Sequence, residues 1–329
     1  MKVVVLTTSY PSTEHPVAGT FVRASVEAAR GAGIDVRVVS PDAFPHFGIA
    51  YGAGILQNLR AAPWRIAAVP AFAASFALAA RRAARDADLV HAHWIPSALA
   101  AHATGKPYVL QVWGTDVLLA RRAPAVVEPL VAGARCVLAA STFLAEQASS
   151  LGARDVVVVP TPVHVPERLV EPEEPPHVLY AGRLSEEKGI LEFLEATEGL
   201  PRVVIGDGPL RPSVPEARGF VAPAQLGAYY ERAAVVCVPS RREGYGVTAR
   251  EALAYGRPVV ATRVGGLADL GPGTVFVEPG DVTALREAVA SLLADANRRR
   301  VLGAEGRAHA VSAADAGSLL EATYLSSLG

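Results

Sequence analysis

The sequence contains few cysteines and few lysines. Its two cysteines, Cys136 and Cys237, each lie in an apolar run, and its three lysines are Lys2, Lys106 and Lys188. Two scattered cysteines cannot form a disulfide framework or a zinc site, so we expect a reducing compartment. Because the other basic residues are all arginine, each lysine is of interest as a candidate functional residue.

A strong net charge and a long apolar run are also lacking. The chain has 31 Lys and Arg residues against 32 Asp and Glu residues, so no overall field favours nucleic acid as a partner. The most apolar stretch, residues 70–80, is shorter than the roughly 20 residues that span a bilayer. The N-terminal residues lack the basic region and cleavage site of a signal peptide. We therefore expect a cytoplasmic protein, and the hydrophobic content of 51% indicates a sizeable core.

Short apolar runs alternate with longer helical patterns along the chain. Near-continuous β-branched runs separated by helices are typical of parallel strands buried on both faces. In the first half the runs lie at residues 3–9, 35–41, 88–94, 107–114, 135–141 and 155–160. In the second half they lie at residues 177–182, 202–207, 218–223, 234–240 and 257–262.

The two sets of runs are separated by residues 164–177, which are rich in proline and acids and lack periodicity, as in a linker. A chain of 329 residues suits two domains of roughly 150 residues each. We predict an α/β protein with two doubly wound parallel-sheet domains, residues 1–168 and 169–329, facing each other across a cleft. We expect a last helix, residues 313–329, to pack back onto the first domain.

The most informative segment lies at residues 240–266. Two acids, Glu243 and Glu251, are separated by seven residues, with a glycine turn between them, a strand before the turn and an amphipathic helix after it. Such a unit presents free backbone N–H groups and the positive end of a helix dipole, which suit a phosphate. The acids would repel the phosphate, so we expect them to accept hydrogen bonds from neighbouring hydroxyl groups. A ligand with both groups is a sugar nucleotide.

Two other interpretations of this segment are open. Residues 248–251 fit a T-x-x-E capping box, in which Glu251 would bond the N–H of Thr248 and contribute about 1 kcal/mol. Residues 244–249 satisfy a weak dinucleotide fingerprint, but the acid that follows, Asp269, lies in a glycine-rich loop rather than at a strand end. A Walker A sequence is absent. We prefer the sugar-nucleotide interpretation, in which Glu243 contacts the ligand and Glu251 is either a ligand contact or a cap.

A second candidate phosphate site follows the run at residues 177–182. Arg183 and Lys188 flank a short turn there, and arginine can bind a diphosphate as a planar fork while lysine binds it as a point charge. Alternatively, both are solvated charges balanced by Glu186 and Glu187. We prefer phosphate binding because the turn follows a strand that should point into the cleft and because lysine is so rare in the chain.

Three polar residues end strands of the first half. His91 and His93 lie on one face of their strand, where one is expected to pack with a hydrogen bond and the other to face the cleft and a sugar hydroxyl. Metal binding is disfavoured, because no acid or cysteine lies at a supporting spacing. Asp116 would either face the same cleft as a substrate contact or cap the following helix.

Two further segments of the first half are of functional interest. The polar loop at residues 8–22 ends at Gly19 before a helix, whose N–H groups would meet an anion or acceptor, or simply be capped. Residues 60–85 are apolar with arginine at both ends. They form either a core-facing helix or a patch that rests peripherally on a membrane surface, at its inner face.

These motifs, in this order, resemble family 4 of the glycosyltransferases, the retaining group with the two-domain GT-B fold. The resemblance is densest in the second half, in the Glu243–Glu251 motif with the residues up to 266, and in segments 182–189, 206–209 and 219–240. It implies an enzyme, of hexosyltransferase type, that moves a sugar from a nucleotide diphosphate to a hydroxyl acceptor, which would be a glycan, a lipid or a small molecule.

The resemblance also implies a role for each matched residue. Arg183 and Lys188 would hold the leaving diphosphate in place of a metal ion, so no metal or other cofactor is expected. Glu243 would contact the donor sugar and Glu251 the ribose hydroxyls. Further contacts with donor or acceptor are implied for Val221, near the base, for the N–H groups of Gly244, Tyr245, Gly246, Val247 and Thr248, and for Gly19 and His93 of the first domain.

The sequence departs from the family pattern at Trp113, where the family often has a histidine, and at residues 161–164, which replace an Asn-Gly-Val-Asp sequence. The chain is also shorter than most members, so acceptor loops are expected to be trimmed. The alternatives are another GT-B enzyme, such as a sugar-nucleotide epimerase or a phosphorylase, and a non-catalytic sugar-nucleotide-binding protein.

Overall fold

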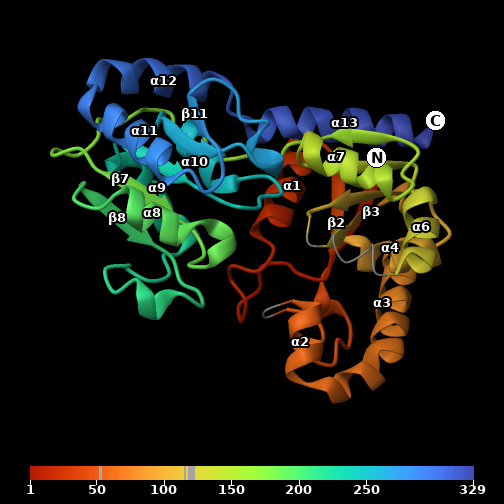
Figure 1. Ribbon diagram of the computed structural model, residues 1–329. Helices are drawn as coiled ribbons and strands as arrows, with labels where there is room; N and C mark the ends of the chain where they lie inside the picture. Colours follow the sequence, from red (N-terminus) through yellow and green to blue (C-terminus); the bar gives the residue numbers. More distant parts are fainter. Residues whose placement is uncertain (52–53, 115, 118–122) are drawn as a thin grey trace. The chain divides into compact units, whose positions relative to one another are not determined.

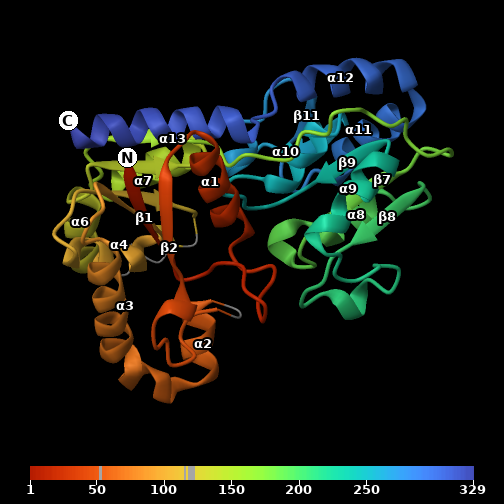
Figure 2. The ribbon, with the colours of Figure 1, turned by 180° about the vertical axis from the view of Figure 1, so that it is seen from behind.

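The computed structural model describes residues 1–51, 54–114, 116–117 and 123–329. The chain forms two compact units, unit 1 from Met1–Pro162 with Ala313–Gly329, and unit 2 from Val163–Ser312. Figures 1 and 2 show the ribbon from opposite sides. The predicted boundary lay at residues 168 and 169. Unit 2 begins earlier because the Val163 N–H donates to the Val311 carbonyl at 3.1 Å, which ties the start of the linker to unit 2.

Unit 1 contains a parallel sheet with the strand order β2-β1-β3-β4-β5-β6. All six runs predicted in the first half form strands. Their bounds are β1 Lys2–Leu6, β2 Asp35–Val39, β3 Leu89–His93, β4 Tyr108–Val112, β5 Cys136–Ala139 and β6 Val156–Val158. Every residue of β3 and β4 is buried, as expected of central strands covered on both faces. The strand order reverses between β1 and β3, which makes their carboxyl ends the topological switch point of unit 1.

The helices of unit 1 follow the sequence pattern. They are α1 Thr20–Gly31, α2 Ile55–Ala61, α3 Val69–Ala83, α4 Ile95–Ala103, α6 Pro124–Ala132, α7 Thr142–Ser150 and α13 Ala313–Leu328, with 3-10 turns η1 Pro41–Ala43 and η2 Pro63–Ala68. The last helix, α13, packs against α1, and the two lie next to each other in both views (Figures 1 and 2). A Cβ at Gly317 would lie 2.5 Å from the Ala28 carbonyl oxygen, so a glycine is needed where the two helices meet.

Unit 2 contains a second parallel sheet, with the order β11-β10-β9-β7-β8. Its strands are β7 Val178–Ala181, β8 Arg202–Ile205, β9 Val235–Val238, β10 Val259–Thr262 and β11 Thr274–Val277. Its helices are α8 Ile190–Ala196, α9 Pro223–Arg232, α10 Val247–Ala254, α11 Val282–Ala294 and α12 Ala296–Ala308, with 3-10 turns η3 Glu186–Lys188, η4 Arg211–Ser213 and η5 Gly265–Leu267. Here the order reverses between β7 and β9, which places the switch point at their carboxyl ends.

One prediction for unit 2 was wrong, and one strand was not predicted. Residues 218–223 do not form a strand: only an isolated bridge joins Gly206 to Gly219, Phe220 is exposed, and Pro223 already begins α9. Strand β11 was not predicted, because it is a short edge strand with mostly half-buried residues and therefore lacks the continuous apolar pattern of the inner strands.

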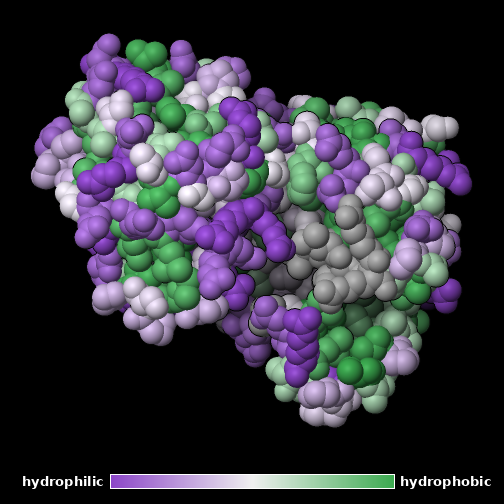
Figure 3. All heavy atoms as spheres, viewed as in Figure 1, coloured by the Kyte–Doolittle hydropathy of each residue, from purple (hydrophilic) through white to green (hydrophobic). Residues whose placement is uncertain are grey.

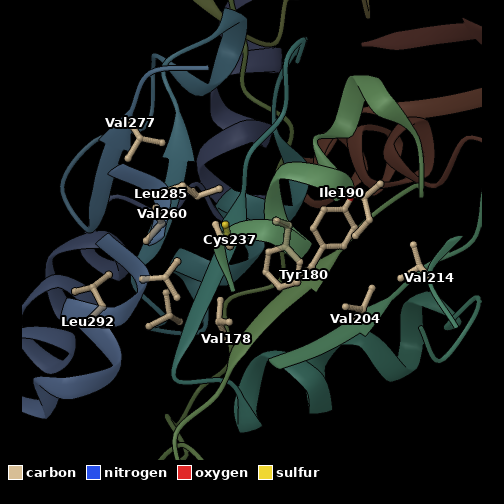
Figure 4. Packing of buried hydrophobic residues seen from close by; sticks show 14 of the residues in the cluster. Val178, Tyr180, Ile190, Val204, Val214, Cys237, Val260, Val277, Leu285 and Leu292 are labelled. Atoms are coloured by element: carbon tan, nitrogen blue, oxygen red, sulfur yellow. The ribbon is translucent and has the colours of Figure 1, made fainter. Parts of the chain in front are cut away.

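Alternate residues of the inner strands build cores on the two faces of this sheet. Val178 and Tyr180 of β7 join one cluster with Cys237 of β9 and Val260 of β10, as Figure 4 shows. Leu179 of β7 joins the opposite cluster, together with Val236, Val238, Val259 and Ala261. This alternation is the period of two that a strand imposes on its side chains. Cys237 is therefore a small core residue, and burial raises the pKa of its thiol.

Candidate functional site in unit 2

The loops that follow β7 and β9 meet at the switch point of unit 2. A Cβ at Gly189 would lie 1.9 Å from the Pro239 carbonyl oxygen, and Gly189 has a left-handed φ of 69°, so only glycine fits between the loops. The Arg241 N–H donates to the Glu187 carbonyl at 2.8 Å. Main-chain packing and hydrogen bonding thus fix the turn that carries Lys188 against the loop that carries Glu243.

Lys188 and Glu243 form an ion pair at this junction. The Lys188 Nζ lies 2.6 Å from the Glu243 Oε2, with side-chain exposures of 29% and 16%. The Ser240 hydroxyl donates to the same oxygen at 3.4 Å. Lys188 is therefore balanced by Glu243 across the loops and not by Glu186 or Glu187, which are exposed neighbours in the turn. The pair joins the two residues that the sequence predicted for the diphosphate and the donor sugar.

Arg183 lies immediately after β7, two residues past Ala181. It is exposed, and within the described residues its guanidinium has no hydrogen-bond or ion-pair partner. Its main chain is held in place, because the Tyr180 hydroxyl donates to the Arg183 carbonyl at 2.9 Å. The result is a fixed backbone with a free cationic side chain, which suits an anionic ligand.

Helix α10 begins beside the same strand end. Its N-cap is Gly246, which has a left-handed φ of 82°, and the Thr248 hydroxyl donates to the Ala181 carbonyl at 3.1 Å. The first N–H groups of a helix have no partner inside the helix, so those of Val247 and Thr248 are available to an anion at the end of β7. The hydrogen bond from Thr248 to Ala181 holds the start of α10 beside the chain segment that continues into Gly182 and Arg183.

Glu251 lies in α10 and is oriented by a tyrosine of α9. The Tyr230 hydroxyl donates to the Glu251 Oε2 at 2.7 Å. Burial raises the pKa of Glu251, and the bond from Tyr230 lowers it in part. The capping-box interpretation was wrong, because the helix starts at Val247 with Gly246 as its N-cap and Thr248 is already its second residue. Within the described residues, the second oxygen of Glu251, Oε1, has no hydrogen-bond partner.

The remaining predicted residues of unit 2 shape the site through packing. Tyr245 is buried, with the Arg250 guanidinium 4.2 Å from its ring centroid. Arg250 also donates to the carbonyl of Gly266 at 3.1 Å. Gly244 lies against this same residue, since a Cβ at Gly266 would be 2.1 Å from the Gly244 carbonyl oxygen. Val221 is half-buried and packs against the core cluster below α9.

Sequence reasoning missed Tyr230, Ser240 and Arg250. Tyr230 is separated from its partner Glu251 by 21 positions and belongs to another helix, so no local spacing connects them. Arg250 resembles any surface residue of an amphipathic helix, yet burial lowers the pKa of its guanidinium. Ser240 is the one with a usable signal, because it ends the β9 run directly before the glycine turn.

Candidate functional residues in unit 1

The two histidines of β3 are both buried, in contrast to the expectation that one would face a cleft. Their rings stack with centroids 4.2 Å apart. The His91 Nδ1 lies 2.7 Å from the Tyr324 hydroxyl of α13, as expected of a packed, hydrogen-bonded histidine. Burial lowers the pKa of His91 to about 3 and that of His93 well below its usual range, so both rings are neutral at pH 7.

His93 differs from His91 in having no hydrogen-bond partner at either ring nitrogen within the described residues. Its other face stacks on Trp113, with ring centroids 5.7 Å apart. It ends β3 at the switch point of unit 1, where α/β sheets bind ligands. Among the described residues, no group of three or more His, Cys, Asp or Glu side chains is arranged to hold a metal ion.

Asp116 caps α4, a helix that precedes it in the sequence. Its Oδ2 accepts from the N–H of Ile95, the first residue of α4, at 3.3 Å. Its Oδ1 accepts from the N–H groups of Trp113 and Gly114 at 3.1 and 3.0 Å. Burial raises the pKa of Asp116, and these bonds oppose the shift. Asp116 therefore ties the end of β4 to the start of α4, and both its oxygens are engaged with backbone.

Gly19 is the N-cap of α1, with a left-handed φ of 61°. A Cβ there would lie 2.2 Å from the Ser9 carbonyl oxygen, so the loop after β1 passes directly over the helix start. This places Gly19 at the other side of the unit 1 switch point, after β1, while His93 ends β3. Both predicted residues of unit 1 thus lie where ligands bind in such sheets.

Comparison with known proteins

The chain matches two family descriptions in succession. Residues 18–166 match Glycosyltransferase Family 4, and residues 175–295 match Glycosyl transferases group 1. The Bacillus subtilis protein TuaC, named as a teichuronic acid biosynthesis glycosyltransferase, is 30% identical over 343 aligned positions that cover 88% of each chain. A D-inositol 3-phosphate glycosyltransferase of Xylanimonas cellulosilytica is 36% identical over 165 positions, or 43% of this chain and 40% of that protein.

Solved structures share the fold at low sequence identity. Sucrose-phosphate synthase from Thermosynechococcus elongatus superposes with a TM-score of 0.78 at 19% identity, covering 99% of this chain and 98% of that one. Anabaena HepE in complex with UDP-glucose superposes with a TM-score of 0.73 at 17% identity, covering 99% and 100%. These likenesses and the two parallel sheets confirm the predicted GT-B fold.

The chain belongs to family 4 of the glycosyltransferases, and it is a glycosyltransferase. The resemblance inferred from the motifs is therefore confirmed.

Proposed function

We propose that this glycosyltransferase uses a nucleotide diphosphate-sugar as donor, retains the anomeric configuration, and works without a metal ion. The observation that carries the proposal is the Lys188–Glu243 ion pair beside the start of α10. It combines a cation for phosphate, an acid for hydroxyl groups and free helix N–H groups at one switch point. A ligand with phosphate alone would satisfy only part of this arrangement, whereas a sugar nucleotide satisfies all of it.

Arg183 and Lys188 would bind the diphosphate and stabilise the charge that develops on it as the bond to the sugar breaks. To do so, Lys188 has to exchange Glu243 for a phosphate oxygen. The released Glu243 carboxylate would then accept hydrogen bonds from the donor sugar. The N–H groups of Val247 and Thr248 would add neutral donors whose positions are already fixed by the bond from Thr248 to Ala181.

The nucleoside part of the donor would lie toward α9. Glu251 would accept hydrogen bonds from the ribose hydroxyls through the oxygen that Tyr230 does not occupy. Val221, two residues before the start of α9, would lie near the base. HepE, which was crystallised with UDP and with UDP-glucose, has a similar fold, and this likeness supports a nucleotide-sugar donor here.

Retention would follow from attack on the face of the sugar that the diphosphate leaves, with a phosphate oxygen taking the proton of the acceptor hydroxyl. The acceptor would bind unit 1, near Gly19 and His93. His93 is buried with a neutral imidazole whose two nitrogens are unpaired within the described residues, so a hydroxyl of the sugar or acceptor would reach it only if the side chains around it move. Transfer needs the hydroxyl acceptor as a second substrate. When no acceptor is present, we expect slow hydrolysis of the donor, in which water takes the place of the acceptor.

The test measures donor binding and turnover in matched variants. Sugar nucleotides of different bases are first screened by thermal shift, since a ligand stabilises in proportion to RT ln(1 + [L]/Kd). With the best donor, Arg183→Ala and Lys188→Ala should each lower kcat/KM by about 100-fold or more, the loss of one preorganised charge. Arg300→Ala, an exposed arginine of α12 in the same unit, serves as control and should leave turnover unchanged.

Wild-type turnover in either site variant would refute the phosphate assignment. An anomeric product of inverted configuration, seen by NMR, would refute retention. Full activity after exhaustive treatment with a chelator is expected, and restoration of lost activity by a divalent cation would refute metal independence. Conversion of the donor into an isomeric sugar nucleotide with no acceptor would instead identify an epimerase, and a requirement for free phosphate would identify a phosphorylase.

A further inference from the structure

Residues 43–85 of unit 1 differ in charge from the rest of the chain. No aspartate or glutamate occurs between Asp42 and Asp86, although the whole chain has a net charge of −1. The segment carries five arginines, Arg60, Arg65, Arg81, Arg82 and Arg85. It is therefore a cationic lobe, which we call the 43–85 lobe, on a protein that is otherwise slightly acidic.

Large apolar side chains of this lobe are exposed. Trp64 is 69% exposed, Ile66 59% and Leu78 49%. Helix α2 buries none of its residues. Figure 3 shows apolar side chains next to hydrophilic ones over the part of unit 1 where Figure 1 draws α2 and α3. Exposed aromatic and aliphatic residues beside arginines are typical of a surface that enters a lipid interface.

These exposed residues are not an unfilled part of the core. The inward side of α3 has its own apolar residues, Phe72, Phe76 and Ala80, which are all buried. Phe72 and Phe76 pack on Phe44, with ring centroids 5.8 and 4.4 Å apart. The helix therefore has one face committed to the protein, and its opposite face, with Leu78, is apolar without a partner in the described residues.

The lobe is fixed to unit 1 and does not cross a bilayer in this fold. The segment Pro63–Ala83 is long and apolar enough to do so by length and composition. However, Arg37 donates to the Ala83 carbonyl at 3.0 Å and Arg81 to the Ala103 carbonyl at 2.6 Å, which holds the end of α3 on the domain. A helix with a buried face and anchored end is suited to lie along a membrane surface.

We propose that the 43–85 lobe docks unit 1 onto an anionic lipid surface, with Trp64 and Ile66 entering the headgroup region. Tryptophan is favoured at that depth because its ring is apolar and its N–H polar. The arginines would add attraction to negatively charged headgroups, and the absence of acids removes the repulsion that most surfaces of this chain would meet. This docking is independent of the donor site in unit 2.

The experiment is flotation of the full chain with vesicles of phosphatidylcholine, with and without added phosphatidylglycerol. We expect binding to the anionic vesicles that weakens as salt is raised. Trp64→Ser with Ile66→Ser should weaken binding to the anionic vesicles by at least about tenfold, because two side chains that would be buried in the headgroup region are lost. The matched control is Val126→Ser with Leu325→Ser, which are also exposed apolar residues of unit 1 and should bind as wild type.

The charge contribution is tested separately. Arg60, Arg82 and Arg85 changed together to Gln should weaken binding about fivefold for each charge, on the order of a hundredfold for all three. The same three-charge change at the exposed Arg135, Arg154 and Arg300 is the control and should have little effect. Circular dichroism and thermal unfolding, both of which should match wild type, show that each variant is folded in both units.

Three results would overturn the proposal. One is the lack of binding to anionic vesicles by the wild-type chain. Another is equal binding by wild type and by the variant without Trp64 and Ile66. The third is concentration-dependent self-association that the same variant abolishes while vesicles are not bound, which would identify a second copy of the chain as the occupant of the lobe.

Discussion

Replacing Tyr230 by phenylalanine removes one hydroxyl group and thereby tests whether Glu251 is a ribose ligand. The Tyr230 side chain is buried, and the bond from its hydroxyl to Glu251 is 2.7 Å long. A hydrogen bond to a charged group contributes about 1.5–3 kcal/mol, and the phenylalanine ring leaves no cavity beyond the missing oxygen. We expect the free energy of unfolding to fall by about 1–2 kcal/mol as the half-buried carboxylate loses its donor.

The effect on ligand binding is more specific. Without its donor, the Glu251 side chain loses its fixed orientation, and its pKa rises further because the bond that lowers it is gone. The affinity for a nucleoside diphosphate should therefore fall by about tenfold, corresponding to about 1.4 kcal/mol. The affinity for the 2′-deoxy analogue should change much less, since part of the contact is already missing.

Calorimetric titration of both nucleotides into both proteins gives the ratio of ribose to deoxyribose affinity. The control is Tyr229→Phe, the neighbouring tyrosine of α9, whose ring faces the Arg218 guanidinium at 5.8 Å. The ratio of ribose to deoxyribose affinity in Tyr229→Phe should equal that of wild type. If Tyr230→Phe also keeps the wild-type ratio, the hydroxyl does not position a ribose ligand and Glu251 is not one.

Two further predictions concern stability. Because burial raises the folded-state pKa of Glu251, the folded state binds its proton more tightly, so this carboxyl costs stability as pH rises through the unfolded and then the folded pKa. Glu251→Gln cannot ionise, so urea unfolding should show it gaining stability relative to wild type as pH rises above the ordinary pKa of a glutamate, about 4.3. A constant difference would contradict this. Gly189→Ala forces a Cβ against Pro239 at a left-handed φ and should cost about 2–4 kcal/mol. Gly152→Ala, with a φ of 89° and open space, should cost only about 1 kcal/mol, and equal losses would refute the packing argument.

The sequence predicted the parts of the fold that depend on local patterns. The buried inner strands were found because parallel strands covered on both faces are continuous apolar runs, as in β3 and β9. The edge strand β11 was missed, and residues 218–223 were misassigned, because pairing at a sheet edge depends on the neighbouring strand more than on the residues themselves.

The site residues that lie at strand ends, or in the loops after them, could be predicted from the sequence. Arg183, Glu243 and Gly19 lie in the loops that follow β7, β9 and β1, and His93 ends β3, so their positions were inferred from the strand pattern alone. Their partners were not, because each depends on packing between elements far apart in sequence. The bond between Tyr230 and Glu251 is the clearest example, since a local capping box explained the same glutamate from sequence.

The return of α13 to unit 1 has a consequence for how the chain folds. Unit 1 is discontinuous, and unit 2 is inserted between residue 162 and residue 313. Tyr324, which lies near the end of the chain, is buried and contacts His91 in the centre of the first sheet. During synthesis, unit 2 can therefore complete its own core first, whereas unit 1 has to wait until residues 313–329 have left the ribosome.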